Sequence, residues 1–251
     1  MIGIIGYGFV GKAVENAFTR CDSIISDPKY NSITIQDICT ASPKAIFVCL
    51  PTPSDDSNYS ILKGALRQLQ ESNYAGVIVV KSTILPHHLD EFNVVVNPEF
   101  LSRGSANEDF INPPFVLFGG NLQDCEQLNT IYKMYSEVDL TNTKFTDIKT
   151  ACLAKYTFNS FYATKLTFMN AIYDITQSIG VDYNELKSII EMQPWIANSH
   201  LDVPGHEGRG FAGPCLPKDT EALAKEFNVE LLKNVLDLNT LYRTEDKNGS
   251  N

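Results

Sequence analysis

The feature that most constrains the fold is a glycine-rich segment near the start of the chain, Gly6-Tyr7-Gly8-Phe9-Val10-Gly11, directly after the apolar run Ile2–Ile5. The pattern GxGxxG between a strand and a helix permits a tight turn. It also lets a pyrophosphate approach the backbone at the N-terminus of the helix. A stripe of apolar residues at helical spacing follows, made of Val10, Ala13, Val14, Ala17 and Phe18. The segment therefore predicts a strand, a turn and a helix that bind a dinucleotide.

An acidic residue stands where the second strand is expected to end. The run Ser23–Ser26 is followed by Asp27, sixteen residues past Gly11. A carboxylate at this place can accept hydrogen bonds from both ribose hydroxyls of NAD. Lys29 could instead meet a 2′-phosphate, which keeps NADP as an alternative, and we favour NAD. The other interpretation is a glycine turn in an unrelated α/β protein, with Asp27 as a surface residue.

Short apolar runs recur along the first part of the chain, separated mostly by segments that could hold helices. The runs are Ile2–Ile5, Ser23–Ser26, Ala45–Leu50, Val77–Lys81, Val94–Val96 and Phe115–Phe118. Apolar, β-branched strands that alternate with helices are typical of a parallel sheet covered on both faces. We therefore expect an α/β fold, with a Rossmann-like doubly wound sheet over residues 1–146.

The pattern changes to a long helical stretch at Asp147, a possible N-cap, and the stretch ends at Gly180. This predicts an α-helical central domain over residues 147–243. The polar residues 244–251 predict a flexible tail.

The long helix carries more apolar surface than a small domain can cover. Its large side chains include Phe158, Phe161, Tyr162, Leu166 and Phe168. We expect a homodimer that forms through this helix.

Composition excludes several classes of function. The 251 residues carry a formal net charge of −10, which repels a polyanionic backbone, so nucleic-acid binding is not expected. No apolar run is long enough to span a bilayer, and Met1–Ile5 reads as a buried strand, not as a secretory signal. The six cysteines show neither CxxC spacing nor a regular framework, which favours a reducing compartment. A cytoplasmic protein is expected.

One cysteine lies at the predicted start of a helix. Cys215 follows a glycine-rich segment, and Pro217 is placed near the first position of the helix. The helix dipole and Lys218 would both lower the pKa of the thiol, which makes Cys215 a candidate nucleophile. Asp219, four residues on, could act as a base or hold a water. The plainer interpretation is a buried cysteine in a glycine-rich turn.

Several motifs, taken together and in this order, resemble those of the UDP-glucose/GDP-mannose dehydrogenase family. They are GYGFVG at Gly6–Gly11, LPTP at Leu50–Pro53, KST at Lys81–Thr83, NPEFL at Asn97–Leu101, AKYTFN at Ala154–Asn159 and GFAGPCLPKD at Gly210–Asp219. The resemblance covers residues 1–240. It implies an NAD-dependent nucleotide-sugar 6-dehydrogenase, which oxidises the C6 alcohol of a sugar such as that of UDP-glucose to a carboxylate by two hydride transfers.

The resemblance also implies catalytic roles. Cys215 resembles the nucleophile that adds to the C6 aldehyde, and hydride loss from the thiohemiacetal gives a thioester. Lys155 and Asn159 resemble a pair that stabilises an oxyanion, and their spacing of four residues puts both on one helix face. The remaining roles are carried by Thr83 and Asp219, which resemble the pair that positions a water, and by Glu99, which resembles the general acid/base of thioester hydrolysis.

Binding residues follow from the same motifs. The cofactor-binding residues expected are Gly6, Gly8, Phe9, Val10, Gly11, Asp27, Pro51, Thr52, Ser82 and Thr83. The substrate-binding residues expected are Glu99, Phe100, Leu101, Lys155, Asn159, Gly210, Phe211, Ala212 and Lys218.

The chain departs from the family pattern in three respects. Arg103 stands where the family has a glutamate after NPEFL, and Ala212 replaces the third glycine of GFGG. Family members also carry a third domain that binds the nucleotide of the substrate, so we expect this chain alone to bind NAD and to turn over nucleotide sugars poorly.

Two alternatives stay open. A two-electron dehydrogenase of the β-hydroxyacid type also joins a Rossmann domain to a helical domain, although it leaves the Cys215 motif unexplained. A non-catalytic nucleotide-binding protein derived from the enzyme is the other alternative. No metal is expected, because the Cys and His residues form no recognisable tetrahedral set.

Overall fold

The computed structural model describes residues 1–52, 59–101 and 104–248, and the chain divides into two compact units, Met1–Lys155 and Tyr156–Asn251. The division falls within the helix α6 (Ile148–Ile179), whose start lies next to the domain limit expected at residues 146 and 147. The domain limits themselves stay a prediction.

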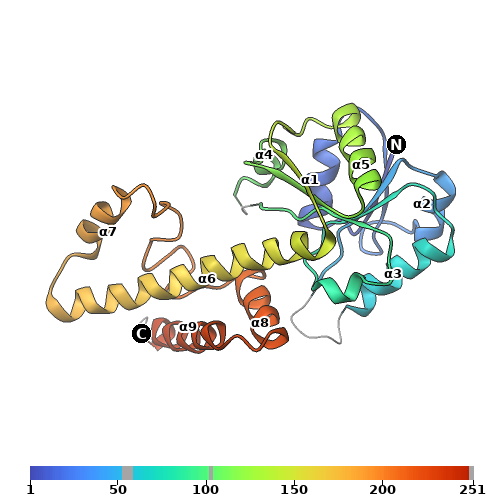
Figure 1. The fold of residues 1–251 in the computed structure, drawn as a ribbon. Coiled ribbons are helices and arrows are strands. Elements are labelled where there is room, and N and C mark those ends of the chain that lie inside the picture. The colour runs from blue at the N-terminus through green and yellow to red at the C-terminus, as the bar shows by residue number, and fades with distance from the viewer. Residues whose placement is uncertain (53–58, 102–103, 249–251) are drawn as a thin grey trace. The chain divides into compact units, whose positions relative to one another are not determined.

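The first unit is built on a sheet that has seven strands among the described residues, in the order β2-β1-β3-β4-β5-β6-β7 (Figure 1). The strands are β1 (Ile2–Ile5), β2 (Ser23–Ser26), β3 (Ala45–Val48), β4 (Val77–Val80), β5 (Val95–Val96), β6 (Val116–Gly119) and β7 (Thr143–Thr146). Five of the six apolar runs predicted as strands contain one of them, and the sixth, Phe115–Phe118, overlaps β6 but stops one residue short of its end. The α/β fold with a Rossmann-like sheet is thus confirmed.

The expectation of a wholly parallel sheet is wrong at one place. β5 and β6 pair antiparallel, with Val96 opposite Gly119, whereas the other neighbouring strands are parallel. All residues of β5 and β6 are buried, and a run buried on both faces does not reveal its direction. The edge strand β7 was not predicted, because its sequence TKFT holds a single apolar residue.

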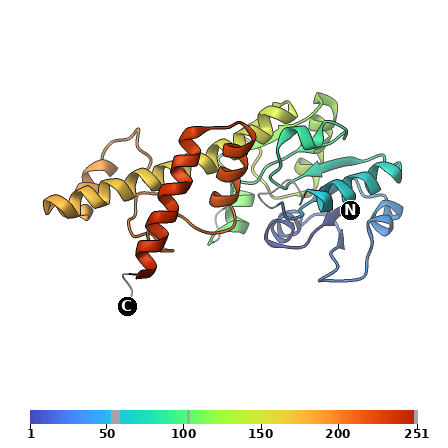
Figure 2. The same ribbon diagram turned by 90° about the horizontal axis from the view of Figure 1, so that it is seen from below.

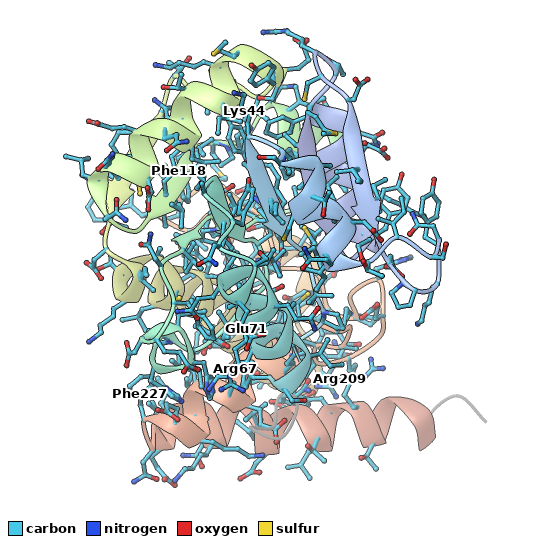
Figure 3. The ribbon with its side chains drawn as sticks, turned by 90° about the vertical axis from the view of Figure 1, so that its right-hand side faces the viewer. Lys44, Arg67, Glu71, Phe118, Arg209 and Phe227 are labelled. Carbon is cyan, nitrogen blue, oxygen red and sulfur yellow. The ribbon has the colours of Figure 1, made fainter. Side chains whose placement is uncertain are left out.

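Helices cover both faces of the sheet (Figure 1). One face packs against α1 (Phe9–Ala17), α4 (Ala106–Ile111) and α5 (Leu122–Tyr135). The other packs against α2 (Ile35–Ala41), α3 (Ser60–Glu71) and the short 3₁₀ helix η2 (Pro86–Leu89). Side chains alternate between the two cores along a strand, so Phe47 of β3 faces one and Val48 the other. Phe118 of β6, labelled in Figure 3, lies with its ring centroid 5.4 Å from that of Tyr132 on α5.

The second unit is helical. It contains most of α6, with α7 (Tyr183–Glu191), α8 (Leu216–Glu226) and α9 (Glu230–Asn248), and α8 and α9 lie side by side (Figure 2). The predicted ends of α6 are confirmed, because Asp147 Oδ1 accepts the N–H of Thr150 at 2.9 Å and Gly180 has a φ of 72°.

The predicted tail needs a correction. α9 continues through Asn248, so residues 244–248 are helical, and residues 249–251 lie outside the described part of the chain. Among the described helices, none is long and apolar enough to cross a membrane.

Candidate functional site

The glycine-rich turn after β1 has a separate physical reason for each glycine. Gly6 has a φ of +90°, and a Cβ there would lie 2.6 Å from the carbonyl oxygen of Cys49. A Cβ on Gly11 would lie 2.2 Å from the carbonyl oxygen of Gly6, so Gly11 allows α1 to pack on β1. Gly8 caps α1, and a Cβ there would have nothing within 4 Å. This open space beside the N-terminus of a helix fits the approach of a pyrophosphate.

Asp27, at the end of β2, is held by the same turn. Its carboxylate accepts the N–H of Tyr7 at 2.7 Å and the N–H of Lys29 at 2.8 Å. These two backbone hydrogen bonds, that of Tyr7 first, lower the pKa of Asp27 and keep it ionised at neutral pH. The geometry fits the ribose-binding role expected for Asp27.

Further cofactor-binding candidates follow β3 and β4, at the carboxyl edge of the parallel strands where α/β proteins bind ligands. Thr52 is buried and Pro51 exposed. Ser82 Oγ donates to the carbonyl oxygen of Leu50 at 2.6 Å, which ties the two segments together, and Thr83 beside it is half-buried.

Glu99 and Lys155 form an ion pair. Lys155 Nζ lies 3.1 Å from Glu99 Oε1 and donates to the carbonyl oxygen of Glu99 at 2.7 Å. Glu99 Oε2 accepts the N–H of Leu101 at 2.8 Å, and Lys155 Nζ lies 5.4 Å from the centroid of the Phe100 ring. The side chains of Glu99 and Lys155 are 13% and 7% exposed, respectively. These contacts bring together four of the residues predicted for substrate binding.

A buried polar network behind this pair was not assigned a role from the sequence. Lys81 follows β4, and its Nζ donates to Asn97 Oδ1 at 3.0 Å. Tyr132 Oη donates to the same oxygen at 2.6 Å, and Asn97 Nδ2 donates to the carbonyl oxygen of Leu117 at 2.9 Å. Burial lowers the pKa of Lys81 from 10.5 to about 8. The sequence feature that could have marked Lys81 is its place as a lysine directly after the apolar strand β4.

The second unit holds Cys215 at the N-cap of α8, where the residue is exposed. The other cysteines are half-buried or buried, and burial raises the pKa of the Cys49 and Cys152 thiols to about 12. Those two thiols stay protonated at neutral pH. Cys215 therefore has the exposure and the place at a helix N-terminus that a nucleophilic thiol requires.

Asp219, one turn after Cys215, is 1% exposed. It accepts from Asn159 Nδ2 at 2.5 Å and pairs with Lys218. The structure thus brings together Asn159, Lys218 and Asp219. The contact between Lys218 and Asp219 was not predicted from the sequence, which indicated only an effect of Lys218 on the pKa of the Cys215 thiol and a role in substrate binding.

Two buried asparagines hold the backbone ahead of Cys215, and neither was predicted. Asn170 Oδ1 on α6 accepts the N–H of Gly210 at 3.1 Å. Asn239 Oδ1 on α9 accepts the N–H of Phe211 at 2.6 Å, and Asn239 Nδ2 donates to the carbonyl oxygen of Phe211 at 3.0 Å. Gly210 needs its φ of +73°, and a Cβ there would lie 2.4 Å from Asn239 Oδ1.

Arg209, which directly precedes Gly210, is held by its own side-chain contacts. Its guanidinium lies 4.7 Å from the ring centroid of Tyr242 and 5.3 Å from that of Tyr173, and it pairs with Asp174 at 2.5 Å. The substrate-binding candidates Gly210, Phe211 and Ala212 therefore follow a firmly anchored residue.

The predicted catalytic residues divide between the units, with Thr83, Glu99 and Lys155 in the first and Asn159, Cys215 and Asp219 in the second. Pro53 of the LPTP motif and Arg103 lie outside the described residues. Among residues 1–52, 59–101 and 104–248, no group of three or more His, Cys, Asp or Glu side chains is placed to hold a metal ion.

Two models of one protein family match the chain in succession. The NAD binding domain of the UDP-glucose/GDP-mannose dehydrogenase family matches residues 22–139, and the central domain of that family matches residues 149–241.

Curated relatives agree with the family models. A UDP-glucose 6-dehydrogenase of Rickettsia felis is 36% identical over 197 residues, which cover 72% of this chain and 43% of the relative. A GDP-mannose 6-dehydrogenase of Pseudomonas syringae is 31% identical over 200 residues, covering 70% of this chain and 44% of the relative. The chain spans somewhat less than half the length of these relatives.

A solved structure of a UDP-glucose dehydrogenase from Pyrobaculum islandicum superposes with a TM-score of 0.81 at 24% identity. The alignment covers 96% of this chain and 68% of that structure. At this identity the similarity supports the fold.

Proposed function

Because the chain belongs to the UDP-glucose/GDP-mannose dehydrogenase family, we propose that it forms the cofactor-binding and catalytic parts of an NAD-dependent nucleotide-sugar 6-dehydrogenase. The substrate class is a UDP-glucose-like nucleotide sugar. The C6 alcohol, two NAD and one water become the carboxylate, two NADH and three protons. The observation that carries the proposal is the exposed Cys215 at the N-terminus of α8, within the segment GFAGPCLPKD.

Cys215 supplies the nucleophile. The C6 alcohol first loses a hydride and its hydroxyl proton and becomes the aldehyde. The sulfur of Cys215 then adds to the aldehyde carbon, and a C–S bond forms while the carbonyl oxygen becomes an alkoxide that is then protonated. Loss of a hydride and the hydroxyl proton from this thiohemiacetal leaves a thioester, and water then cleaves the C–S bond to release the carboxylate and the thiol. NAD, when bound, accepts a hydride at each of the two oxidation steps.

Lys155 and Asn159 are proposed to stabilise the oxyanion. They lie one turn apart on α6, and both are amine or amide donors with buried side chains. Lys155 is paired with Glu99, so the ammonium is held ready beside the residue proposed as general acid/base. A donor whose position is fixed before the reaction needs little rearrangement in the transition state.

Thr83 and Asp219 are proposed to position the water. Asp219 is buried and accepts hydrogen bonds from Asn159 and Lys218, which fixes the orientation of its carboxylate. These assignments rest on the family resemblance.

Product stoichiometry tests this function. The protein is mixed with NAD and, in turn, with UDP-glucose, GDP-mannose and other nucleotide sugars, and NADH absorbance is compared with the sugar consumed. The proposal expects two NADH per sugar. One NADH per sugar would favour a two-electron dehydrogenase of the β-hydroxyacid type, and NAD binding without NADH would favour a non-catalytic protein.

Self-association is proposed through α6. Phe161 and Phe168 are each 61% exposed and Ile175 is 53% exposed, and their spacing of seven residues puts them on one side of the helix. Phe168→Asp should shift the mass measured by light scattering from that of a dimer to that of a monomer. Lys149→Asp, which changes an exposed lysine of the same helix, is the control and should keep the mass of the dimer. A monomeric wild-type protein would contradict this proposal.

The cytoplasm is the proposed compartment. Cys21, Cys39, Cys49, Cys125 and Cys152 are free thiols, which suits a reducing environment. Neither a nucleic acid nor a membrane is a proposed partner, and the net charge of −10 supports the first of these statements.

A further inference from the structure

Lys81 is a buried charge for which the proposed mechanism has no use. The residue is 4% exposed and lies directly after β4. Its ammonium donates to Asn97 Oδ1 and lies 4.7 Å from the centroid of the Phe110 ring. Across the described residues, the hydrogen bond to Asn97 is its single one, although an ammonium has three donors.

Such a group weakens the fold. Taking an ammonium out of water costs stability, and one neutral acceptor, one aromatic face and the negative charge of Glu99 return part of that cost. A methionine of similar shape would fill the same space without the penalty. Packing alone therefore does not explain a lysine at this position.

A small cavity adjoins the ammonium. It has a volume of about 30 Å³, and its lining includes Lys81, Asn97, Glu99 and Tyr132. That is room for a water molecule, which would satisfy a further donor of the ammonium. The charge thus lies on the same cavity as the carboxylate proposed for thioester hydrolysis.

The contacts of Lys81 join the two segments that carry proposed site residues. Ser82 and Thr83 follow Lys81 directly, and Asn97 precedes Glu99 by two residues. Asn97 is 2% exposed, accepts from both Lys81 and Tyr132, and donates to the carbonyl oxygen of Leu117. The network therefore ties the ends of β4 and β5 to β6 and α5.

We propose that Lys81 is a positioning residue: its ammonium fixes Asn97 and so holds the segment that carries Thr83 against the segment that carries Glu99. The inference rests on the proposed function for the importance of Thr83 and Glu99. The structural effect is that the segments after β4 and β5 are held together at the edge of the sheet where NAD is proposed to bind.

The test compares Lys81→Met with Lys81→Arg and with Lys44→Met. Lys44, labelled in Figure 3, is an exposed lysine next to β3 at the opposite edge of the same sheet, so Lys44→Met makes the same chemical change where no site is proposed. NAD affinity is measured by calorimetry, stability by thermal unfolding, and local order by hydrogen exchange. These readouts involve no turnover, so they stand even where the Cys215 chemistry fails.

Lys81→Met should unfold at the same or a higher temperature than wild type and yet bind NAD on the order of tenfold more weakly. Exchange should rise in residues 97–101, where the Leu101 N–H reports the place of Glu99, and stay unchanged in β3. Lys81→Arg should recover most of the affinity, and Lys44→Met should match wild type.

Two results would overturn the inference. One is a Lys81→Met protein with wild-type NAD affinity and unchanged exchange in residues 97–101. The other is a protein that loses stability and affinity together and is not rescued by arginine, because that outcome marks a merely structural lysine.

Discussion

Asn239 on α9 pairs with both backbone polar atoms of Phe211, accepting its N–H at 2.6 Å and donating to its carbonyl oxygen at 3.0 Å. One side chain thus takes the place of a neighbouring strand for a buried residue that precedes Cys215 by four positions. Because the pairing satisfies a donor and an acceptor away from water, its removal leaves both without partners.

Asn239→Leu should lower the free energy of unfolding by about 3 kcal/mol, since two buried polar groups lose their partners. Asn234→Leu is the matched control, because Asn234 lies on the same helix, is exposed, and donates to the carbonyl oxygen of Glu230 in its own helix. Urea unfolding of both variants measures the difference. Equal changes in the free energy of unfolding of the two variants would show that the pairing of Asn239 with Phe211 does not stabilise the fold.

Two glycines of the first turn should separate cofactor binding from folding. Gly8→Ala places a methyl group in open space, so the melting temperature should stay within a few degrees while NAD affinity falls by on the order of tenfold or more. Gly11→Ala forces a contact with the backbone of Gly6, and it should lower both. Calorimetry and thermal unfolding decide the matter, and unchanged NAD affinity in Gly8→Ala would place the pyrophosphate elsewhere.

The charge on Lys81 predicts a pH dependence of stability. Its pKa is about 8 in the fold and 10.5 ordinarily, so below pH 8 the folded state bears a protonated, buried ammonium at a cost of about 3 kcal/mol. Between pH 8 and 10.5 the unfolded chain binds more protons than the folded one at this site, and the contribution of Lys81 to stability improves as pH rises.

The difference between Lys81→Met and wild type isolates this effect. Other groups that act on the charge of Lys81 are Cys49, Glu99 and Lys155, and they are present in both proteins. The stability advantage of Lys81→Met should be largest at pH 7 and shrink towards pH 10. A difference that is constant from pH 7 to 10 would show that Lys81 does not lose its proton early.

Lys155→Met should reduce the rate of acid formation by about 10² to 10³, as the loss of one oxyanion donor does. Lys149→Met, an exposed change six residues earlier on α6, should leave the rate unchanged. Thermal unfolding of both variants checks that the fold persists. Equal rates for Lys155→Met and wild type would show that the ion pair of Lys155 with Glu99 has a structural role only.

Local patterns predicted the first unit well, because buried strands are short apolar runs and the glycine turn has few alternatives. They failed where the deciding contact is distant. Nothing in Thr143–Thr146 distinguishes an edge strand from a loop, and nothing in Phe115–Phe118 indicates that β6 runs against β5. Strand direction depends on the connections between strands.

The candidate site was likewise predictable where it rests on local sequence and not where it rests on distant contacts. The motifs around Cys215 and Glu99 could be read in sequence, since each is a contiguous segment that resembles a family pattern. Asn239 and Phe211 are separated by 28 residues, and Lys81 and Asn97 by 16, and neither asparagine stands in a pattern that marks a partner. Such pairings are set by how helices and strands pack.

The most direct test of the central proposal is acid formation by Cys215→Ser with the protein in excess over nucleotide sugar, so that a slow reaction is still recorded. Cys21→Ser, at a half-buried cysteine, is the control. Wild type and Cys21→Ser should form the sugar acid with two NADH per sugar, while Cys215→Ser forms none and still binds NAD with wild-type affinity. Sugar acid formed by Cys215→Ser at the wild-type rate would contradict the covalent mechanism.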